Sequence, residues 1–151
     1  MINNMDDLEK VLRPYIIKAM ELTEEVIFKK IQEKIEDYYA EYQPIVYQRT
    51  DKLRKAPFKS EIKKNGNSYY FVVGFKDDYL TFQYPGNPQW KRDIPATGED
   101  VLGYFNSQSH GGTVKGSHDY WNEVIEELGG EQGLLNLFKQ NCKKVGIPII
   151  N

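Results

Sequence analysis

The chain has 151 residues, 40% of them hydrophobic and 28% charged, with a formal net charge of −2. This composition predicts one globular domain over residues 1–151, and the near-zero net charge argues against a uniformly basic nucleic-acid binder. No apolar run approaches the roughly 20 residues of a membrane-spanning helix, and the single cysteine, Cys142, excludes an internal disulfide and a thiolate-rich metal site. The acidic N-terminal stretch lacks the apolar core of a signal peptide, so we expect synthesis and folding in a reducing cytoplasm.

Apolar residues recur every three or four positions through the first forty residues, which is the spacing of one helix face. Because proline is tolerated at the first helical position, we expect a short helix over residues 5–12 and a long helix from about Pro14 to Glu41. We expect the charged residues on the opposite face to be solvated: Glu21, Glu24, Glu25, Lys29, Glu33, Lys34, Glu36 and Asp37.

The end of this helical pattern is unusually rich in tyrosine. Residues 37–53 read DYYAEYQPIVYQRTDKL, and Pro44 should end the helix, because proline clashes with the preceding turn and lacks a backbone donor. The four tyrosines are Tyr38, Tyr39, Tyr42 and Tyr47. A tyrosine joins a large apolar ring to a hydroxyl that needs a partner, which suits a half-buried surface. The block therefore predicts a protein–protein interface.

Residues 58–84 change to the pattern of β-structure. Asn65-Gly66 is a strong hairpin signal, and the aromatic and β-branched run over residues 69–73 is typical of a strand. Asp77-Asp78 should form a turn, and residues 79–84 alternate enough to form a third strand. These signals predict an antiparallel β-meander.

A long loop is expected over residues 84–98, which contain three prolines. Trp90 lies in it beside Lys91 and Arg92. An exposed tryptophan between cations is typical of an interface anchor, but the same side chain could fold back as a lid over the core. The sequence leaves both readings open.

The C-terminal third reads as helical. Thr97 should cap a short helix that begins with Glu99 and Asp100, and a polar, glycine-rich loop should follow over residues 108–117. Two helical segments within residues 119–145 are separated by Gly129-Gly130, and residues 147–150 could add an edge strand. We therefore predict an α+β fold in which a long N-terminal helix and a C-terminal helix pack on an antiparallel β-sheet of three to four strands.

Candidate chemical sites are weak. His110 and His118 could be ligands of a metal-dependent hydrolase, but no HExxH or HxH spacing appears and the two lie eight residues apart through a glycine-rich loop. We accordingly expect no catalytic residue, no metal and no cofactor. A second alternative is a small nucleic-acid-binding module, because residues 44–76 hold eight bases against two acids and segment 47–69 interleaves basic and aromatic side chains.

The most specific pattern is a helix ending in Tyr-Tyr, then Tyr-x-Pro, then Tyr-x-Arg-Thr-x-x-Leu. It resembles the head–tail joining (tail-completion, minor tail) proteins of tailed bacteriophages and prophages. The matching residues are Tyr38, Tyr39, Tyr42, Pro44, Tyr47, Arg49, Thr50 and Leu53. Many members continue with a hydrophobic Leu-x-x-Ser, where this chain has Leu53-Arg54-Lys55-Ala56-Pro57.

The resemblance implies a structural protein at the head–tail interface, monomeric in solution, that assembles as a hexameric ring on the tail tube. Its partners would be other phage tail or neck proteins, with DNA touched only in passing and no membrane contact. It would occupy the bacterial host cytoplasm during assembly and the virion tail or neck afterwards. We expect the contact residues to be Tyr47, Arg49, Thr50, Lys52 and Trp90.

Overall fold

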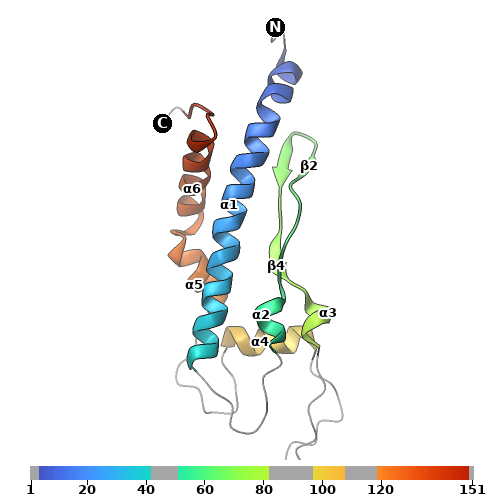
Figure 1. Ribbon diagram of the computed structural model, residues 1–151, viewed down its shortest axis with the longest axis vertical. Coiled ribbons are helices and arrows are strands. Elements are labelled where there is room, and N and C mark those ends of the chain that lie inside the picture. The colour runs from blue at the N-terminus through green and yellow to red at the C-terminus, as the bar shows by residue number, and fades with distance from the viewer. Residues whose placement is uncertain (1–3, 42–50, 82–96, 108–118, 150–151) are drawn as a thin grey trace, which may run out of the picture. The chain divides into compact units, whose positions relative to one another are not determined.

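The structure is a computed structural model, and it describes residues 4–41, 51–81, 97–107 and 119–149. This part of the chain is mostly helical and holds two pairs of short β-strands (Figure 1). In chain order the elements are α1 (Met5–Glu41), α2 (Lys52–Lys55), β1 (Pro57–Lys59), β2 (Lys63–Asn65), β3 (Ser68–Tyr70), β4 (Val73–Phe75), α3 (Asp77–Leu80), α4 (Gly98–Ser107), α5 (Tyr120–Glu127) and α6 (Gly130–Lys144).

Helix α1 is one continuous helix of 37 residues that contains Pro14 in its first half. The predicted break between residues 12 and 14 is therefore wrong. A proline inside a helix removes one backbone hydrogen bond, here the bond to the carbonyl of Lys10. Both residues are exposed, so water can take the place of the missing donor. The apolar stripe continues across the proline and keeps the helix intact.

The hairpin predicted at Asn65-Gly66 is confirmed. Strands β2 and β3 pair antiparallel in the register Lys63↔Tyr70, Lys64↔Tyr69 and Asn65↔Ser68. Gly66 and Asn67 form the two-residue turn, and Gly66 has a φ of 57°, a left-handed conformation that glycine adopts without steric cost.

The predicted single sheet of three to four strands is wrong for the described residues, which form two separate two-stranded pairs, β1–β4 and β2–β3. The interruption lies at Ser60 and Val72. The amide of Ser60 donates to the carbonyl of Val72, but the amide of Val72 donates to the hydroxyl of Ser60. A side chain thus replaces a backbone acceptor, and the regular ladder stops there.

The predicted third strand over residues 79–84 is also not formed where the structure describes it. Residues Asp77–Leu80 form the short helix α3, and residues 82–84 lie outside the described residues. Asp77 and Asp78 lie in the first turn, where a negative charge interacts favourably with the helix dipole. The buried Leu80 holds this turn to the rest of its unit.

The helix boundaries predicted in the C-terminal third are confirmed. The hydroxyl of Thr97 accepts from the amide of Asp100 at 3.2 Å, and the Asp100 carboxylate accepts from the amide of Thr97 at 2.9 Å, a reciprocal cap that starts α4. The chain breaks between α5 and α6 at Gly129, and Gly130 begins α6; their φ values are 84° and 64°. Residues 147–149 carry no regular structure, so the edge strand proposed over residues 147–150 is not observed in its described part.

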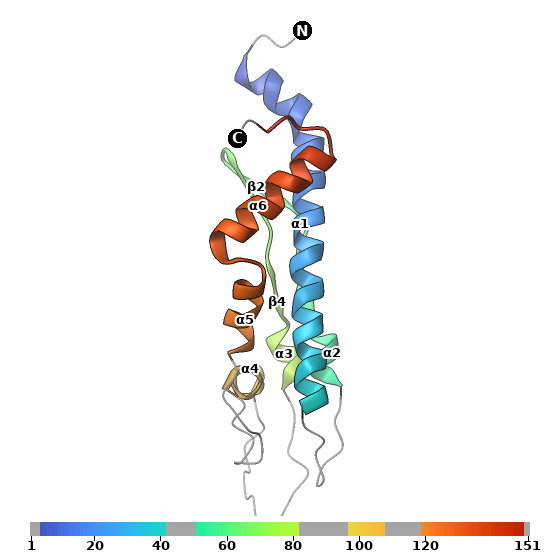
Figure 2. The ribbon, with the colours of Figure 1, turned by 90° about the vertical axis from the view of Figure 1, so that its left-hand side faces the viewer.

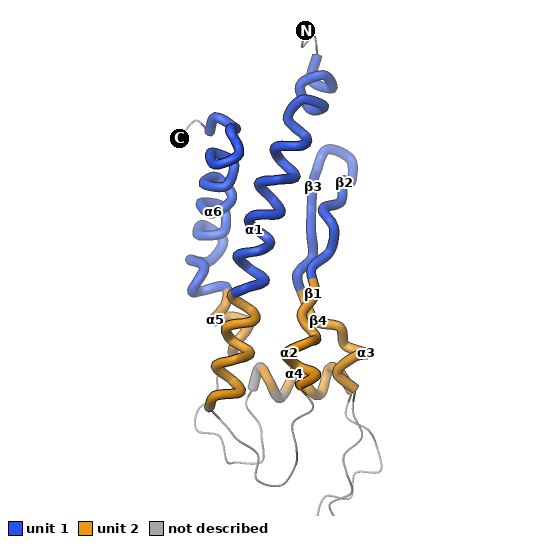
Figure 3. Tube along the Cα trace, in the orientation of Figure 1, with its two compact units in different colours: residues 1–29, 59–73, 125–151 blue, residues 30–58, 74–124 orange. Residues whose placement is uncertain are grey.

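The described chain divides into two compact units, and α1 contributes to both (Figure 3). Unit 1 consists of residues 1–29, 59–73 and 125–151. Within it α6 lies beside the N-terminal part of α1, as Figures 1 and 2 agree. The buried Asn141 of α6 donates to the hydroxyl of Thr23 of α1 at 3.1 Å, and Ala19, Met20 and Cys142 are buried in the same unit.

Unit 2 consists of residues 30–58 and 74–124. Its core is aliphatic and aromatic and is supplied by α1, α2, α3, α4 and α5. The buried apolar residues are Ile31, Ile35, Tyr39, Leu53, Ala56, Leu80, Phe105, Tyr120 and Val124.

Candidate assembly interface

The tyrosine-rich block begins in the interior of unit 2. Tyr39 is buried with 8% of its surface exposed, and Tyr38 is half-buried. Tyr42 and Tyr47 lie outside the described residues. The prediction that the tyrosines form a surface is therefore wrong for Tyr39, because α1 continues to Glu41 and its apolar stripe turns this ring inward.

An aromatic cluster surrounds Tyr38. Its ring meets Phe105 and Tyr120 edge to face at centroid distances of 5.4 and 5.8 Å, and those two rings stack on each other at 4.7 Å. Such ring pairs contribute about 0.5–1.5 kcal/mol each beyond the burial of their area. Phe75 reaches the cluster at 5.9 Å from Phe105. The first tyrosines of the block thus stabilise unit 2.

Arg54 joins the end of α1 to α2. Its guanidinium donates through Nε and Nη2 to the two carboxylate oxygens of Glu36, each at 2.8 Å, and through Nη1 to Asp51 at 2.8 Å. The same group lies 4.2 Å from the centre of the Tyr39 ring. Hydrogen bonding to Glu36 raises the pKa of Arg54, so its charge is permanent. A two-point bond of this kind fixes α2 against the last turns of α1.

Most of the predicted contact residues lie outside the described residues, namely Tyr47, Arg49, Thr50 and Trp90. Lys52 is the exception. Its ammonium group donates to the backbone carbonyl of Thr81 at 2.7 Å, a contact within unit 2. Asp51, which precedes it, has a φ of 54°, unusual for a residue that is not glycine.

The basic segment that follows is partly neutralised by carboxylates of α1. Lys59 pairs with Glu25 at 2.6 Å, and Lys64 pairs with Glu9 at 2.7 Å, both within unit 1. The hydrogen bond to Glu25 raises the pKa of Lys59, and the same contact lowers the pKa of Glu25. A cation that is already paired with a carboxylate contributes less to the affinity for a phosphate group.

Glu9 is the most strongly held of these carboxylates. Hydrogen bonds from Lys64 and then from the Tyr69 hydroxyl lower its pKa to about 2, and Arg13 adds a further pair at 3.0 Å. Within the described part of residues 44–76, Lys55, Lys63 and Lys76 are exposed and have no ion pair, and Lys52 bonds only to a backbone carbonyl. The local excess of positive charge read from the sequence is therefore only partly cancelled, because three of the seven described basic residues in 44–76 form ion pairs: Arg54, Lys59 and Lys64.

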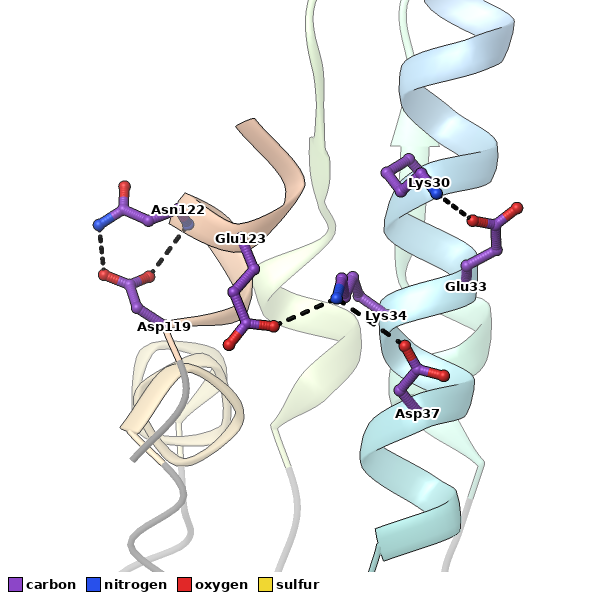
Figure 4. A network of polar contacts seen from close by, with 7 residues as sticks. All are labelled: Lys30, Glu33, Lys34, Asp37, Asp119, Asn122 and Glu123. Atoms are coloured by element: carbon purple, nitrogen blue, oxygen red, sulfur yellow. Dashed lines mark hydrogen bonds and ion pairs between the residues drawn. The ribbon is translucent and has the colours of Figure 1, made fainter. Parts of the chain in front are cut away.

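Two charged residues of α1 that we expected to be solvated are buried, and sequence reasoning missed both. The side chain of Lys34 is 11% exposed, and Figure 4 shows its ammonium group between Glu123 of α5 at 3.2 Å and Asp37 at 3.9 Å. Glu24 is 4% exposed, and no described residue donates to its Oε1 atom. A signal was present for Glu24, since it continues the spacing of Met20, Ile31 and Ile35 along one helix face.

The described residues contain no group of three or more His, Cys, Asp or Glu side chains placed to hold a metal ion. His110 and His118 lie outside the described residues. Burial raises the pKa of the Cys142 thiol. Of the helices that the structure describes, none has the length and apolarity to cross a bilayer.

The chain was compared with protein families, curated proteins and solved structures, and a family model matches it. No curated protein and no solved structure matches the chain. The model of the YomN family matches residues 4–144, which include every described helix and strand. The chain therefore belongs to the YomN family, a phage- and prophage-derived family of Bacillus.

Proposed function

We propose that this protein is a structural component of a phage or prophage particle at the head–tail interface, where it acts as a tail-completion factor and not as an enzyme. The observation that supports this proposal is the match of residues 4–144 to a phage-derived family. Residues 37–53 of the same chain also carry the Tyr-Tyr, Tyr-x-Pro, Tyr-x-Arg-Thr pattern that resembles head–tail joining proteins.

The geometry around that pattern supports an assembly role. Arg54 ties Asp51 and Glu36 together, so described residues on both sides of the sequence pattern are held in one region of unit 2. This region is held by the Tyr38 aromatic cluster and by the bond from Lys52 to Thr81. Binding residues in proteins are commonly positioned by a rigid scaffold of this kind.

The proposed partners follow from this role. The protomer is monomeric in solution and closes into a hexameric ring through heterologous contacts on the end of the tail tube. Tyr47, Arg49, Thr50, Lys52 and Trp90 are the proposed contact residues. The protein is made in the host cytoplasm and ends in the neck or tail of the particle.

A nucleic-acid-binding role has less support. The salt bridges of Lys59 and Lys64 occupy cations that phosphate groups would need. Gel shifts with single- and double-stranded DNA over a salt series separate the two functions. The proposed function predicts weak binding with no preferred strand form.

The decisive experiment is complementation of a particle-producing lysogen from which the gene has been deleted. The double variant Arg49→Glu with Lys52→Glu should yield heads and tails that fail to join, counted by electron microscopy. Because Lys52 bonds to Thr81, circular dichroism and thermal unfolding of the purified variant must first show an intact fold.

The matched control is Lys63→Glu with Lys143→Glu, which changes the net charge equally at two exposed lysines in unit 1. This control should give joined particles in normal yield. Normal particles from the deletion strain itself would rule out the proposed function. If the deletion strain fails but the Arg49 and Lys52 variant gives normal particles, these two residues are not contact residues, and the proposed head–tail role still holds.

A further inference from the structure

Glu24 lines a groove of about 620 Å³ within unit 1. One wall is the part of α1 from Ile17 to Glu25 and the other is the stretch from Lys59 to Ile62, and Figure 3 draws both in the colour of that unit. This volume lies within the range of about 300–1,000 Å³ typical of ligand sites.

The charges around the groove do not cancel. It is lined by four carboxylates and two ammonium groups: Glu21, Glu24, Glu25, Glu61, Lys18 and Lys59. Lys18 is paired with Glu21 at 3.0 Å, and Lys59 is paired with Glu25 at 2.6 Å. Glu24 and Glu61 remain without an ion pair among the described residues.

Glu24 differs from the other three acids because it is buried. Only 4% of its surface is exposed, and its Oε1 atom has no hydrogen-bond donor in the described part of the chain. An unsatisfied buried polar atom destabilises the folded state, and it does so more strongly when the group is charged. Burial raises the pKa of Glu24, and the charge of Lys59 only partly opposes that rise. Because Glu24 lies in the wall of an open groove, a hydrogen-bond donor from another molecule can reach its unsatisfied Oε1 atom.

We propose that this groove binds an arginine side chain on an extended segment of a partner protein, with Glu24 as its principal acceptor and Glu61 as a second carboxylate at the rim. Arginine fits better than lysine because its guanidinium is weakly hydrated and offers several donors in one plane. The inference goes beyond the proposed function and does not depend on it, since it concerns only the chemistry of the groove.

The test uses the full chain and a matched pair of short peptides, acetyl-Gly-Arg-Gly-amide and the same peptide with citrulline, which keeps the shape and removes the charge. Binding is followed by two-dimensional NMR of the backbone amides. The arginine peptide should give saturable shifts at the groove residues of α1 and at Lys59, and the citrulline peptide should not.

Glu24→Gln should weaken binding about ten-fold or more, because the lost bond joins two charged groups. Glu131→Gln removes one exposed acid of α6 outside the groove and should leave the affinity unchanged. Absence of saturable shifts in the natural protein, equal binding of the citrulline peptide, or unchanged affinity in the Glu24 variant would each overturn the proposal.

A second measurement uses the natural protein, so it tests the proposal even when Glu24→Gln does not fold. The carboxyl carbon of Glu24 is followed by NMR through a pH titration, with and without saturating arginine peptide. A cation bound at this carboxylate favours the ionised form, so the peptide should lower the pKa of Glu24. An identical titration in both conditions would show that the peptide does not reach Glu24.

Discussion

Removal of the Glu123 charge should destabilise unit 2 more than removal of its partner, the Lys34 charge. The two side chains form an ion pair at 3.2 Å in which Lys34 is 11% exposed and Glu123 is 30% exposed. The change Glu123→Gln leaves a buried ammonium group with Asp37, which is 3.9 Å away and 62% exposed. The change Lys34→Met leaves a carboxylate that water still reaches, and methionine keeps the packing of the aliphatic stem.

The magnitude follows from this burial. Breaking a fully buried pair costs about 3–5 kcal/mol, whereas an exposed pair is worth about 0–1 kcal/mol. Because Glu123 is partly solvated and Asp37 remains, we expect Glu123→Gln to lower the free energy of unfolding by about 1–3 kcal/mol. We expect Lys34→Met to cost less than about 1 kcal/mol, and the double variant to resemble Lys34→Met alone.

Urea unfolding followed by far-UV circular dichroism measures these differences at pH 7. Glu33→Gln is the matched control, because it removes the same charge from a more exposed pair with Lys30 in α1, in which Glu33 is 62% exposed; this pair is also drawn in Figure 4. The control should cost less than about 1 kcal/mol. The reasoning fails if Glu123→Gln costs no more than Glu33→Gln, or if Lys34→Met proves the more damaging change.

Three further predictions concern packing and pH. Gly98→Ala would place a Cβ atom 2.0 Å from the backbone oxygen of Asp77, so it should lower the free energy of unfolding by about 1–3 kcal/mol. In the same helix, the Cβ atom of Gly103→Ala would meet nothing within 4 Å, so this change should raise the free energy of unfolding by up to about 1 kcal/mol. Equal melting temperatures of the two variants would contradict this reasoning. Asn141→Ala removes a buried donor to Thr23 and should cost about 1–3 kcal/mol in urea unfolding, while no loss would mean that water replaces the bond. Glu24 has a raised pKa in the folded state, so its contribution to stability is present below its ordinary value of 4.5 and is lost as pH rises through the folded pKa. Glu24→Gln should remove that fall in thermal stability, and an unchanged pH profile would show that Glu24 does not cause it.

The sequence alone determined the features that depend on neighbours along the chain. The apolar stripe of α1, the turn between Asn65 and Ser68, the Thr97 cap and the break at Gly129-Gly130 were all predicted and are present. Each rests on a hydrogen bond or a backbone conformation that involves residues a few positions apart. Such signals can be read from one segment without knowing what packs against it.

Which charged and aromatic side chains face inward depends on contacts between residues far apart in the chain. Lys34 is buried because Glu123, 89 positions away, supplies its counter-charge, and Tyr38 is half-buried because Phe105 and Tyr120 pack against it. Glu24 occupies a position on the buried stripe, but nothing along the chain tells that its carboxylate lacks a donor. The free energy of a charged group depends on burial and on partners distant in sequence, which local periodicity does not encode.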